Sequence, residues 1–361
     1  MLNSIHLCRG IAALLVVLFH AAGNLAKDKY FGAVAEPLEK LFWFGGGAGV
    51  AFFFVLSGFI IHHVHERDMD HPQRLLAYLK KRAIRIYPTY WIIFMGVYLL
   101  ALMTPSLRDS MPVDVSVLLK SLLLVPQDSN IVGGTGAPVL VVAWSLQYEL
   151  GFYAAFATAL VRKSILYFIM LAFTVNFILQ PFLPAYEFPR YFLSSHLIIL
   201  FGLGMLASKG AKSKFNLSKP EILVALSACA FCIIGLAANL SRENYPKQGF
   251  DLAYGLVSAV LIFALARHDL EGNRKIMPSR LSFLGDSSYA LYLIHFPLVA
   301  VLSKLSIAVL PKNIWGAGCG FLLLVGGSVM VAAIFHALVE RPVLHYFTPK
   351  RSFQPTHAGG F

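Results

Sequence analysis

Charged side chains are scarce in this sequence of 361 residues, and their scarcity excludes most classes of soluble protein. Asp, Glu, Lys and Arg together make up 13% of the chain, whereas hydrophobic types make up 58%. Soluble domains average about 25% charged and about 45–50% apolar residues. The composition therefore predicts an all-α polytopic membrane protein.

The sequence also lacks the features of nucleic-acid-binding, disulfide-rich and metal-binding proteins. The chain has a net charge of +12, but no basic helix or stripe stands apart from the apolar segments, which argues against nucleic-acid binding. There are four cysteines, all in apolar segments, so no disulfide framework is indicated. The stretch HHVHERDMDH, residues 62–71, is rich in histidine, yet its spacing matches no standard metal site, and no metal is expected.

Long apolar runs are abundant, and each is a candidate transmembrane helix when it reaches about 17–25 residues. The first run is too long for a signal peptide and lacks a cleavage site of small residues, so it is expected to remain as a span. The sequence predicts about ten spans, near 5–26, 43–63, 86–104, 144–161, 164–183, 192–208, 221–240, 251–267, 286–304 and 314–338.

The distribution of basic residues predicts how these spans are oriented. With the N-terminus inside the cell, about two thirds of the 30 Lys and Arg residues fall on the cytoplasmic side, as the positive-inside rule requires. This bias predicts an even number of spans with both termini cytoplasmic. No repeat or linker divides the chain, so residues 1–361 are expected to form one transmembrane domain without an additional soluble domain.

Two of the rare polar residues lie in the first span, in CRGIAALLVVLFHA. Arg9 and His20 are eleven residues apart, which places them on one helix face, roughly 16 Å apart along the axis. A charge near the bilayer centre costs about 2.5–3.5 kcal/mol on insertion scales, so both side chains should face the interior of the bundle. The alternatives are a snorkelling anchor for Arg9 and a hydrogen-bonded core residue for His20.

Further polar residues interrupt three other apolar segments. Arg82 and Arg85, in KKRAIRIYP, share a helix face and could clamp a phosphate, or could simply follow the positive-inside rule. Glu149, in WSLQYELGFY, is the clearest carboxylate within a span and is either functional or a structural partner for a membrane cation. His295, in GDSSYALYLIHFPL, falls about two helical turns into the ninth predicted span. It is either a functional residue or a residue that serves only in packing.

Taken in order, these segments resemble the acyltransferase-3 family of bacterial membrane proteins, which acetylate surface glycans. The resemblance covers nearly the whole chain and rests on six short motifs. The matching positions are Arg9 and His20; Phe53, Phe54, Ser57 and Gly58; Arg82 and Arg85, which the family places in a cytoplasmic loop; Trp144, Ser145, Leu146, Glu149, Phe152 and Tyr153; Ser288, Tyr289, Leu291, Tyr292, Leu293, His295, Pro297 and Leu298; and Glu340, Arg341 and Pro342. Asn24 and Leu150 stand where some members carry acidic residues.

The resemblance implies an O-acyltransferase in the bacterial inner membrane, surrounded by membrane lipids. It implies acetyl-CoA as the donor, although succinyl is possible, and a hydroxyl of exopolysaccharide or O-antigen as the acceptor. Arg9, Arg82 and Arg85 would hold the phosphates of CoA, His20 would be the catalytic base or nucleophile, and Glu149 would orient His20 or balance its charge. The alternative is a glycan transporter or flippase, since intramembrane His and Glu also suit a proton-coupled carrier.

Overall fold

The computed structural model describes residues 3–109, 111–182, 187–213, 219–242, 247–270 and 282–347, and every regular element within these ranges is a helix. Ten long helices carry the architecture. They are α1 (Asn3–Leu25), α3 (Gly45–His65), α4 (Leu75–Met103), α8 (Trp144–Val161), α9 (Lys163–Leu179), α11 (Leu197–Ala211), α12 (Pro220–Leu240), α13 (Lys247–Leu270), α15 (Ser288–Val309) and α16 (Ile314–Phe335).

Short helices join or flank the long ones. These are α2 (Glu36–Phe42), α5 (Pro105–Arg108), α6 (Val115–Leu122), α7 (Ser129–Val132), α10 (Arg190–Leu193), α14 (Ser282–Asp286) and α17 (Arg341–Phe347). Tight helical turns cover Gly32–Ala35, Glu66–Asp68, Pro72–Arg74, Val141–Ala143 and Gln180–Phe182, and a π-helical turn, His336–Glu340, links α16 to α17. The apolar stretch VSVLLKSLLLV, residues 115–125, forms α6 over Val115–Leu122, and Asp114 caps this helix by accepting a hydrogen bond from the Val117 N–H at 2.9 Å.

Nine segments in the described part of the chain are long and apolar enough to cross a membrane. They coincide with nine of the ten predicted spans, and the protein is accordingly a multi-pass membrane protein. The remaining predicted span, 144–161, is helix α8, in which Gln147 and Glu149 lower the hydropathy. The total of ten and the cytoplasmic side of both termini stay predictions, and residues 348–361 lie outside the described ranges.

One predicted boundary was wrong by a wide margin. Helix α4 begins at Leu75, well before the predicted start at residue 86, so Arg82 and Arg85 lie inside a helix and not in a loop. The apolar criterion missed this early part because lysine and arginine interrupt it. The placement of both arginines on one helix face is confirmed by their common cavity, described below.

Helix α3 is the centre of the packing and contacts α1, α11 and α13 extensively. Two glycines permit its close crossing with α11: a Cβ on Gly58 would collide with the backbone of Phe201, and one on Gly204 with the carbonyl of Val55. Small residues at such crossings let helix backbones approach closely in membranes. The motif residue Gly58 thus has a packing role in this fold.

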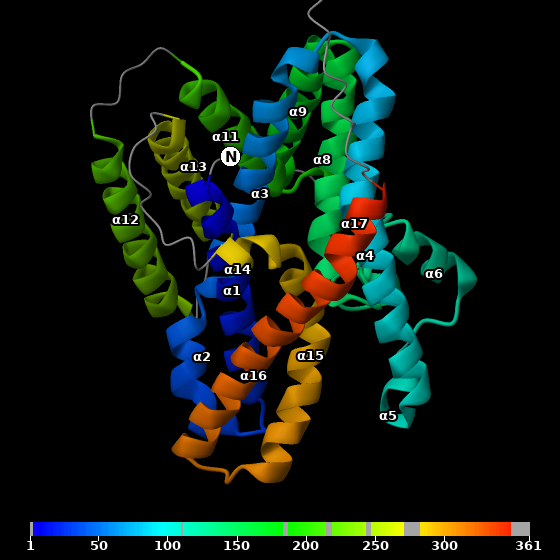
Figure 1. Cartoon of the computed structure of the whole chain (residues 1–361), viewed down its shortest axis with the longest axis vertical. Helices are drawn as coiled ribbons and strands as arrows, with labels where there is room; N and C mark the ends of the chain where they lie inside the picture. Colours follow the sequence, from blue (N-terminus) through cyan, green and yellow to red (C-terminus); the bar gives the residue numbers. More distant parts are fainter. Residues whose placement is uncertain are drawn as a thin grey trace, which may run out of the picture.

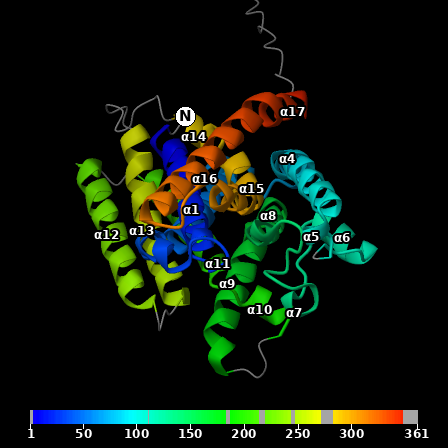
Figure 2. The same ribbon diagram turned by 90° about the horizontal axis from the view of Figure 1, so that it is seen from below.

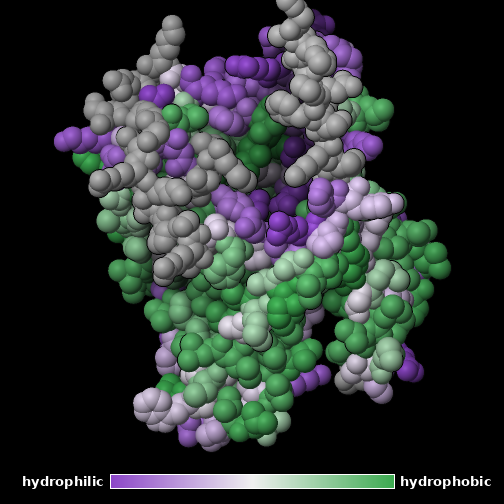
Figure 3. Space-filling view, viewed as in Figure 1, coloured by the Kyte–Doolittle hydropathy of each residue, from purple (hydrophilic) through white to green (hydrophobic). Residues whose placement is uncertain are grey.

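The remaining helices surround this centre. Figures 1 and 2 both place α12 and α13 at one side of the molecule and α4 with α5 and α6 at the opposite side. Apolar side chains cover the visible face of α15 and α16, and hydrophilic ones gather above them around α14 and α17, where the surface is hollowed (Figure 3). Large exposed residues such as Trp315 and Leu322 on α16 fit a face that contacts lipid.

The α3–α11 crossing gives a prediction about stability. Gly204→Ala should lower the melting temperature of the purified protein, because the added methyl meets backbone atoms that no rotamer change can move; overpacking of this kind costs about 1–3 kcal/mol. Gly326→Ala on α16 is the matched control, since nothing lies within 4 Å of its added Cβ. Equal melting temperatures for the two variants would contradict the close crossing.

Candidate functional site

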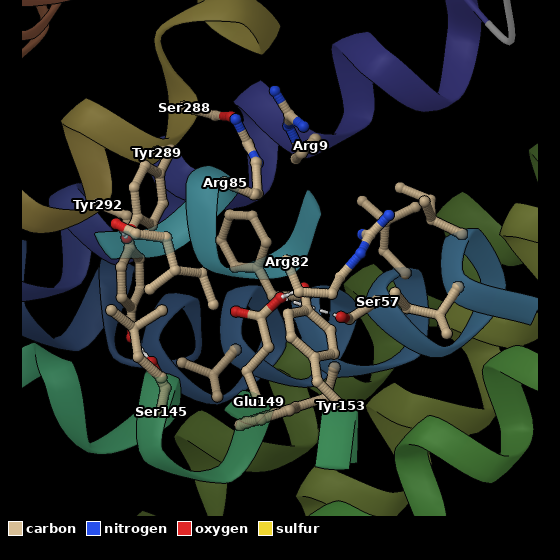
Figure 4. A pocket seen from close by; sticks show the side chains of 18 residues that line it. Arg9, Ser57, Arg82, Arg85, Ser145, Glu149, Tyr153, Ser288, Tyr289 and Tyr292 are labelled. Atoms are coloured by element: carbon tan, nitrogen blue, oxygen red, sulfur yellow. Dashed lines mark hydrogen bonds between the residues drawn. The ribbon is translucent and has the colours of Figure 1, made fainter. Parts of the chain in front are cut away.

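The first cavity of the bundle, the arginine cavity, has a volume of about 170 Å³ and is lined by Arg9 from α1 and by Arg82 and Arg85 from α4. Other polar side chains on its wall come from α3, α8 and α15, namely Ser57, Ser145, Glu149, Tyr153, Ser288, Tyr289 and Tyr292 (Figure 4). The fold therefore brings together five of the six predicted motifs, from segments as far apart as residues 9 and 292.

The three guanidinium groups are held in place but keep free donors. Arg9 donates to the Gly285 carbonyl at 2.5 Å, and Arg82 bonds Nε2 of His65 at 3.2 Å. Arg85 lies 5.2 Å from the centre of the Tyr289 ring. The Nε atoms of Arg9 and Arg82 are buried without a hydrogen-bond partner in the described residues, so donors are left over for an anion.

Glu149 lies on the α8 wall of this cavity, where two hydroxyl groups hold one of its oxygens. Ser57 donates to Oε1 at 3.0 Å, and Tyr153, one helical turn along α8, donates to the same oxygen. The Tyr153 ring in turn lies 5.7 Å from the guanidinium carbon of Arg82. The carboxylate is thus the anionic group of a cavity that otherwise holds three cations.

A second cavity, the histidine cavity, has a volume of about 640 Å³ and is lined by His20 from α1. Aromatic residues form much of its wall, namely Phe19, Trp43, Trp144 and Tyr148, together with Ser195, His196 and Asp251. Val50 and Tyr292 line both cavities, so the two spaces adjoin. Because Arg9 and His20 lie on the same face of α1, the cavities follow one another along the axis of the bundle.

His20 is paired with the second predicted histidine. Nε2 of His295 lies 3.2 Å from Nδ1 of His20, and Nδ1 of His295 lies 3.0 Å from the carbonyl of Leu291. Nδ1 of His20 also lies 2.9 Å from the Val16 carbonyl. A carbonyl oxygen only accepts, so both Nδ1 atoms carry hydrogen, and Nε2 of His295 accepts from His20. This leaves Nε2 of a neutral His20 unprotonated.

This arrangement changes the expected partner of His20. Glu149 was expected to orient the imidazole, but its bonds to Ser57 and Tyr153 hold it on the wall of the arginine cavity. His295, which is fully buried, and the backbone of α1 make the contacts to His20 instead. The sequence could not reveal this, because it places one candidate partner on α8 and the other on α15 without fixing which helix faces α1.

The other motif residues divide between the cavities and the packing. Ser145 and Tyr292 share a hydrogen bond of 2.7 Å where the two cavities adjoin, and Trp144 lines the histidine cavity. Arg341 is exposed at the start of α17 and lines neither of the two cavities. Its neighbour Glu340 is buried and accepts a hydrogen bond from His336 at 2.7 Å.

One buried pair of polar residues belongs to none of the predicted motifs. His196, which precedes α11, bonds Asp251 of α13 at 3.0 Å, and both are buried. Asp251 begins a predicted span, so a carboxylate within an apolar stretch was the available signal. No group of three His, Cys, Asp or Glu side chains in the described ranges is placed to hold a metal ion, and in the histidine-rich stretch His62 instead bonds Ser208.

Comparison with known proteins agrees with the resemblance seen in the motifs. The family described as "Acyltransferase domain", acyltransferase-3, matches residues 2–333. The exopolysaccharide production protein ExoZ of Rhizobium meliloti (strain 1021) is 29% identical over 309 residues, covering 83% of this chain and 90% of ExoZ. Acyltransferase MdmB of Streptomyces mycarofaciens is 25% identical over 375 residues, covering 95% of this chain and 92% of MdmB. No solved structure matches significantly.

The family model matches nearly the whole chain, and most of the family motifs line two adjoining cavities. This membrane protein is therefore an acyltransferase and belongs to the acyltransferase-3 family.

Proposed function

We propose that the protein transfers an acetyl group from cytoplasmic acetyl-CoA to a hydroxyl of a surface carbohydrate such as exopolysaccharide or O-antigen, in the bacterial inner membrane. The observation that carries this proposal is the joining of the arginine cavity to the cavity of His20 at Tyr292. The name of ExoZ, an exopolysaccharide production protein, supports a carbohydrate acceptor. Membership of an acyltransferase family favours this function over the alternative of a glycan carrier.

The arginine cavity suits the anionic end of the donor. CoA carries several phosphates, and guanidinium groups bind phosphate oxygens in a bidentate geometry. Arg9, Arg82 and Arg85 would hold these phosphates at the cytoplasmic side, while the less polar pantetheine arm carries the thioester past Tyr292 toward His20. Glu149 would balance the positive charge of the arginines when the cavity is empty.

His20 then serves as the general base. Its unprotonated Nε2 takes the proton of the acceptor hydroxyl as the hydroxyl oxygen attacks the thioester carbonyl carbon. The carbon–sulfur bond breaks, CoA leaves as a thiolate, and the imidazolium returns the proton to that sulfur. An acyl-His20 intermediate is the second route, and acetyl retained on the protein after incubation with acetyl-CoA alone would distinguish it.

The proposal is tested on the host's surface glycan by mass spectrometry. Deletion of the gene should remove the mass of one acetyl group from each modified sugar, and the wild-type gene should restore it. A deletion strain that makes less or shorter glycan, with the remaining glycan still fully acetylated, would overturn the proposal and favour a carrier.

The His20→Ala variant should lose about 10²–10⁴-fold in kcat, because general base catalysis contributes about that much. The measurement is release of CoA thiol by purified protein given acetyl-CoA and glycan acceptor. His345→Ala is the matched control, since His345 is exposed on α17. Turnover at the wild-type rate in a folded His20→Ala protein would contradict the assignment.

Replacing one of the arginines proposed to hold the phosphates should weaken the binding of acetyl-CoA alone. Arg82→Ala and Arg85→Ala should each raise KM for acetyl-CoA by roughly 10–100-fold, since a hydrogen bond to a charged group is worth about 1.5–3 kcal/mol. Arg341→Ala, which removes an exposed arginine outside both cavities, should leave KM unchanged. An unchanged KM in the first two variants would show that the cavity does not hold the phosphates.

His295 is proposed as a positioning residue that fixes the tautomer of His20. His295→Ala should lower kcat by about 10²-fold or more with KM for acetyl-CoA unchanged, because a wrong tautomer disables the base. His295→Gln should recover part of the loss, since its side-chain oxygen can accept the Nδ1–H of His20 in place of the ring nitrogen. Equal losses in both variants would indicate a purely structural role.

A further inference from the structure

The histidine cavity differs in chemistry from the arginine cavity. Its lining in the described residues includes no arginine, and the one lysine there, Lys247, is exposed at the start of α13. Its volume of about 640 Å³ lies within the range of about 300–1,000 Å³ that is usual for ligand pockets. The cavity is therefore large enough for a second substrate and unsuited to the many phosphates of CoA.

The central polar feature of this wall is the buried pair of His196 and Asp251. Nε2 of His196 lies 3.0 Å from Oδ2 of Asp251, which fixes that oxygen. Oδ1 of the same carboxylate is buried without a hydrogen-bond partner in the described part of the chain. An unsatisfied buried carboxylate oxygen is costly, so a donor supplied by a ligand would remove the penalty.

The aromatic residues of the cavity add flat faces beside this carboxylate. Trp144 and Tyr148 meet edge to face with centroids 6.1 Å apart, and Tyr148 stacks on Phe192 at 4.1 Å, which holds its ring in place. On the α1 side, Phe19 and Trp43 meet at 5.8 Å. An aromatic face carries negative charge density, so it attracts the slightly positive C–H groups of a sugar ring.

A pyranose presents both kinds of group that such a wall recognises. Its hydroxyls are neutral hydrogen-bond donors for the carboxylate, and its C–H face packs on aromatic rings. A polyanion would instead be repelled by Asp251 at short range in a medium of low dielectric constant. His20 lies on the same cavity, so a hydroxyl of a sugar bound there would have access to its Nε2.

We infer that the histidine cavity is the acceptor site, and that Asp251, held by His196, accepts hydrogen bonds from hydroxyls of one pyranose ring that packs on Trp144 and Tyr148. This inference rests on the proposed function, because it identifies where the carbohydrate of that reaction binds. It assigns donor and acceptor to separate cavities that meet at Tyr292.

The test measures glycan binding directly by tryptophan fluorescence. The chain has four tryptophans, and Trp91 and Trp315 lie outside the cavity and are exposed. In a Trp91→Phe, Trp315→Phe background only Trp43 and Trp144 remain as reporters. The probes are oligosaccharides prepared from the producing strain's surface glycan after alkaline removal of acetyl groups, and, separately, CoA.

The oligosaccharides should change the emission of this protein. Asp251→Asn should weaken their Kd by about tenfold or more, since a hydrogen bond to a charged group is lost, while the Kd for CoA, measured with radiolabelled CoA, stays within about twofold. Asp114→Asn is the matched control, because Asp114 caps α6 and lines neither cavity. Unchanged glycan affinity in Asp251→Asn, or no change of emission in the parent protein, would overturn the inference.

Two further results keep the test decisive. If Asp251→Asn also loses CoA binding, and so fails to fold, Trp144→Phe replaces it and should weaken glycan binding severalfold through its smaller face. Glycan binding without any acetyl transfer would refute the proposed function and leave the acceptor site standing. If acetyl transfer occurs but neither Asp251→Asn nor Trp144→Phe changes the glycan affinity, the acceptor site alone would be refuted.

Discussion

The cost of placing charge among apolar helices is the constraint on which this structure depends. A guanidinium or carboxylate facing lipid is expensive, so Arg9, Arg82, Arg85 and Glu149 must face inward and share one polar space. The space is lined in part by α3, and the close crossing of α3 with α11 at Gly58 and Gly204 lies at the centre of the bundle. Grouping these polar side chains inside the bundle avoids the cost of exposing them to lipid, and the same grouping forms the candidate site.

The gathered residues form two environments and not one. The arginine cavity combines three cations with a carboxylate held by Ser57 and Tyr153. The histidine cavity combines aromatic faces with two histidines and, among the described residues of its wall, a single buried carboxylate. In the proposed reaction, a polyanionic donor and a hydroxyl-rich acceptor need different surroundings, and two cavities that follow one another along the bundle axis would provide both. Val50 and Tyr292 lie where the two environments meet, and His20 lines the histidine cavity.

Much of this was predictable, and the exceptions have physical causes. The helical class, nine apolar spans and the shared face of Arg9 and His20 follow from hydropathy and helical period. The early start of α4 was missed because basic residues there interrupt the apolar run. The pairing of His20 with His295 and the His196–Asp251 pair depend on which helices are neighbours, and one sequence does not encode that in any local pattern. Local motifs identified the residues, and only packing assigned their partners.

The central proposal is that donor and acceptor approach His20 from separate cavities. Because these cavities follow one another along α1, a donor that enters from the cytoplasm implies an acceptor that enters from the opposite side of the membrane. The proposal is tested most directly in sealed proteoliposomes of purified protein, with radiolabelled acetyl-CoA outside and de-O-acetylated oligosaccharide trapped in the lumen. Protein molecules whose cytoplasmic side faces outward should produce labelled oligosaccharide inside intact vesicles. Product that forms only after the vesicles are opened, so that both substrates reach the same side, would contradict the account.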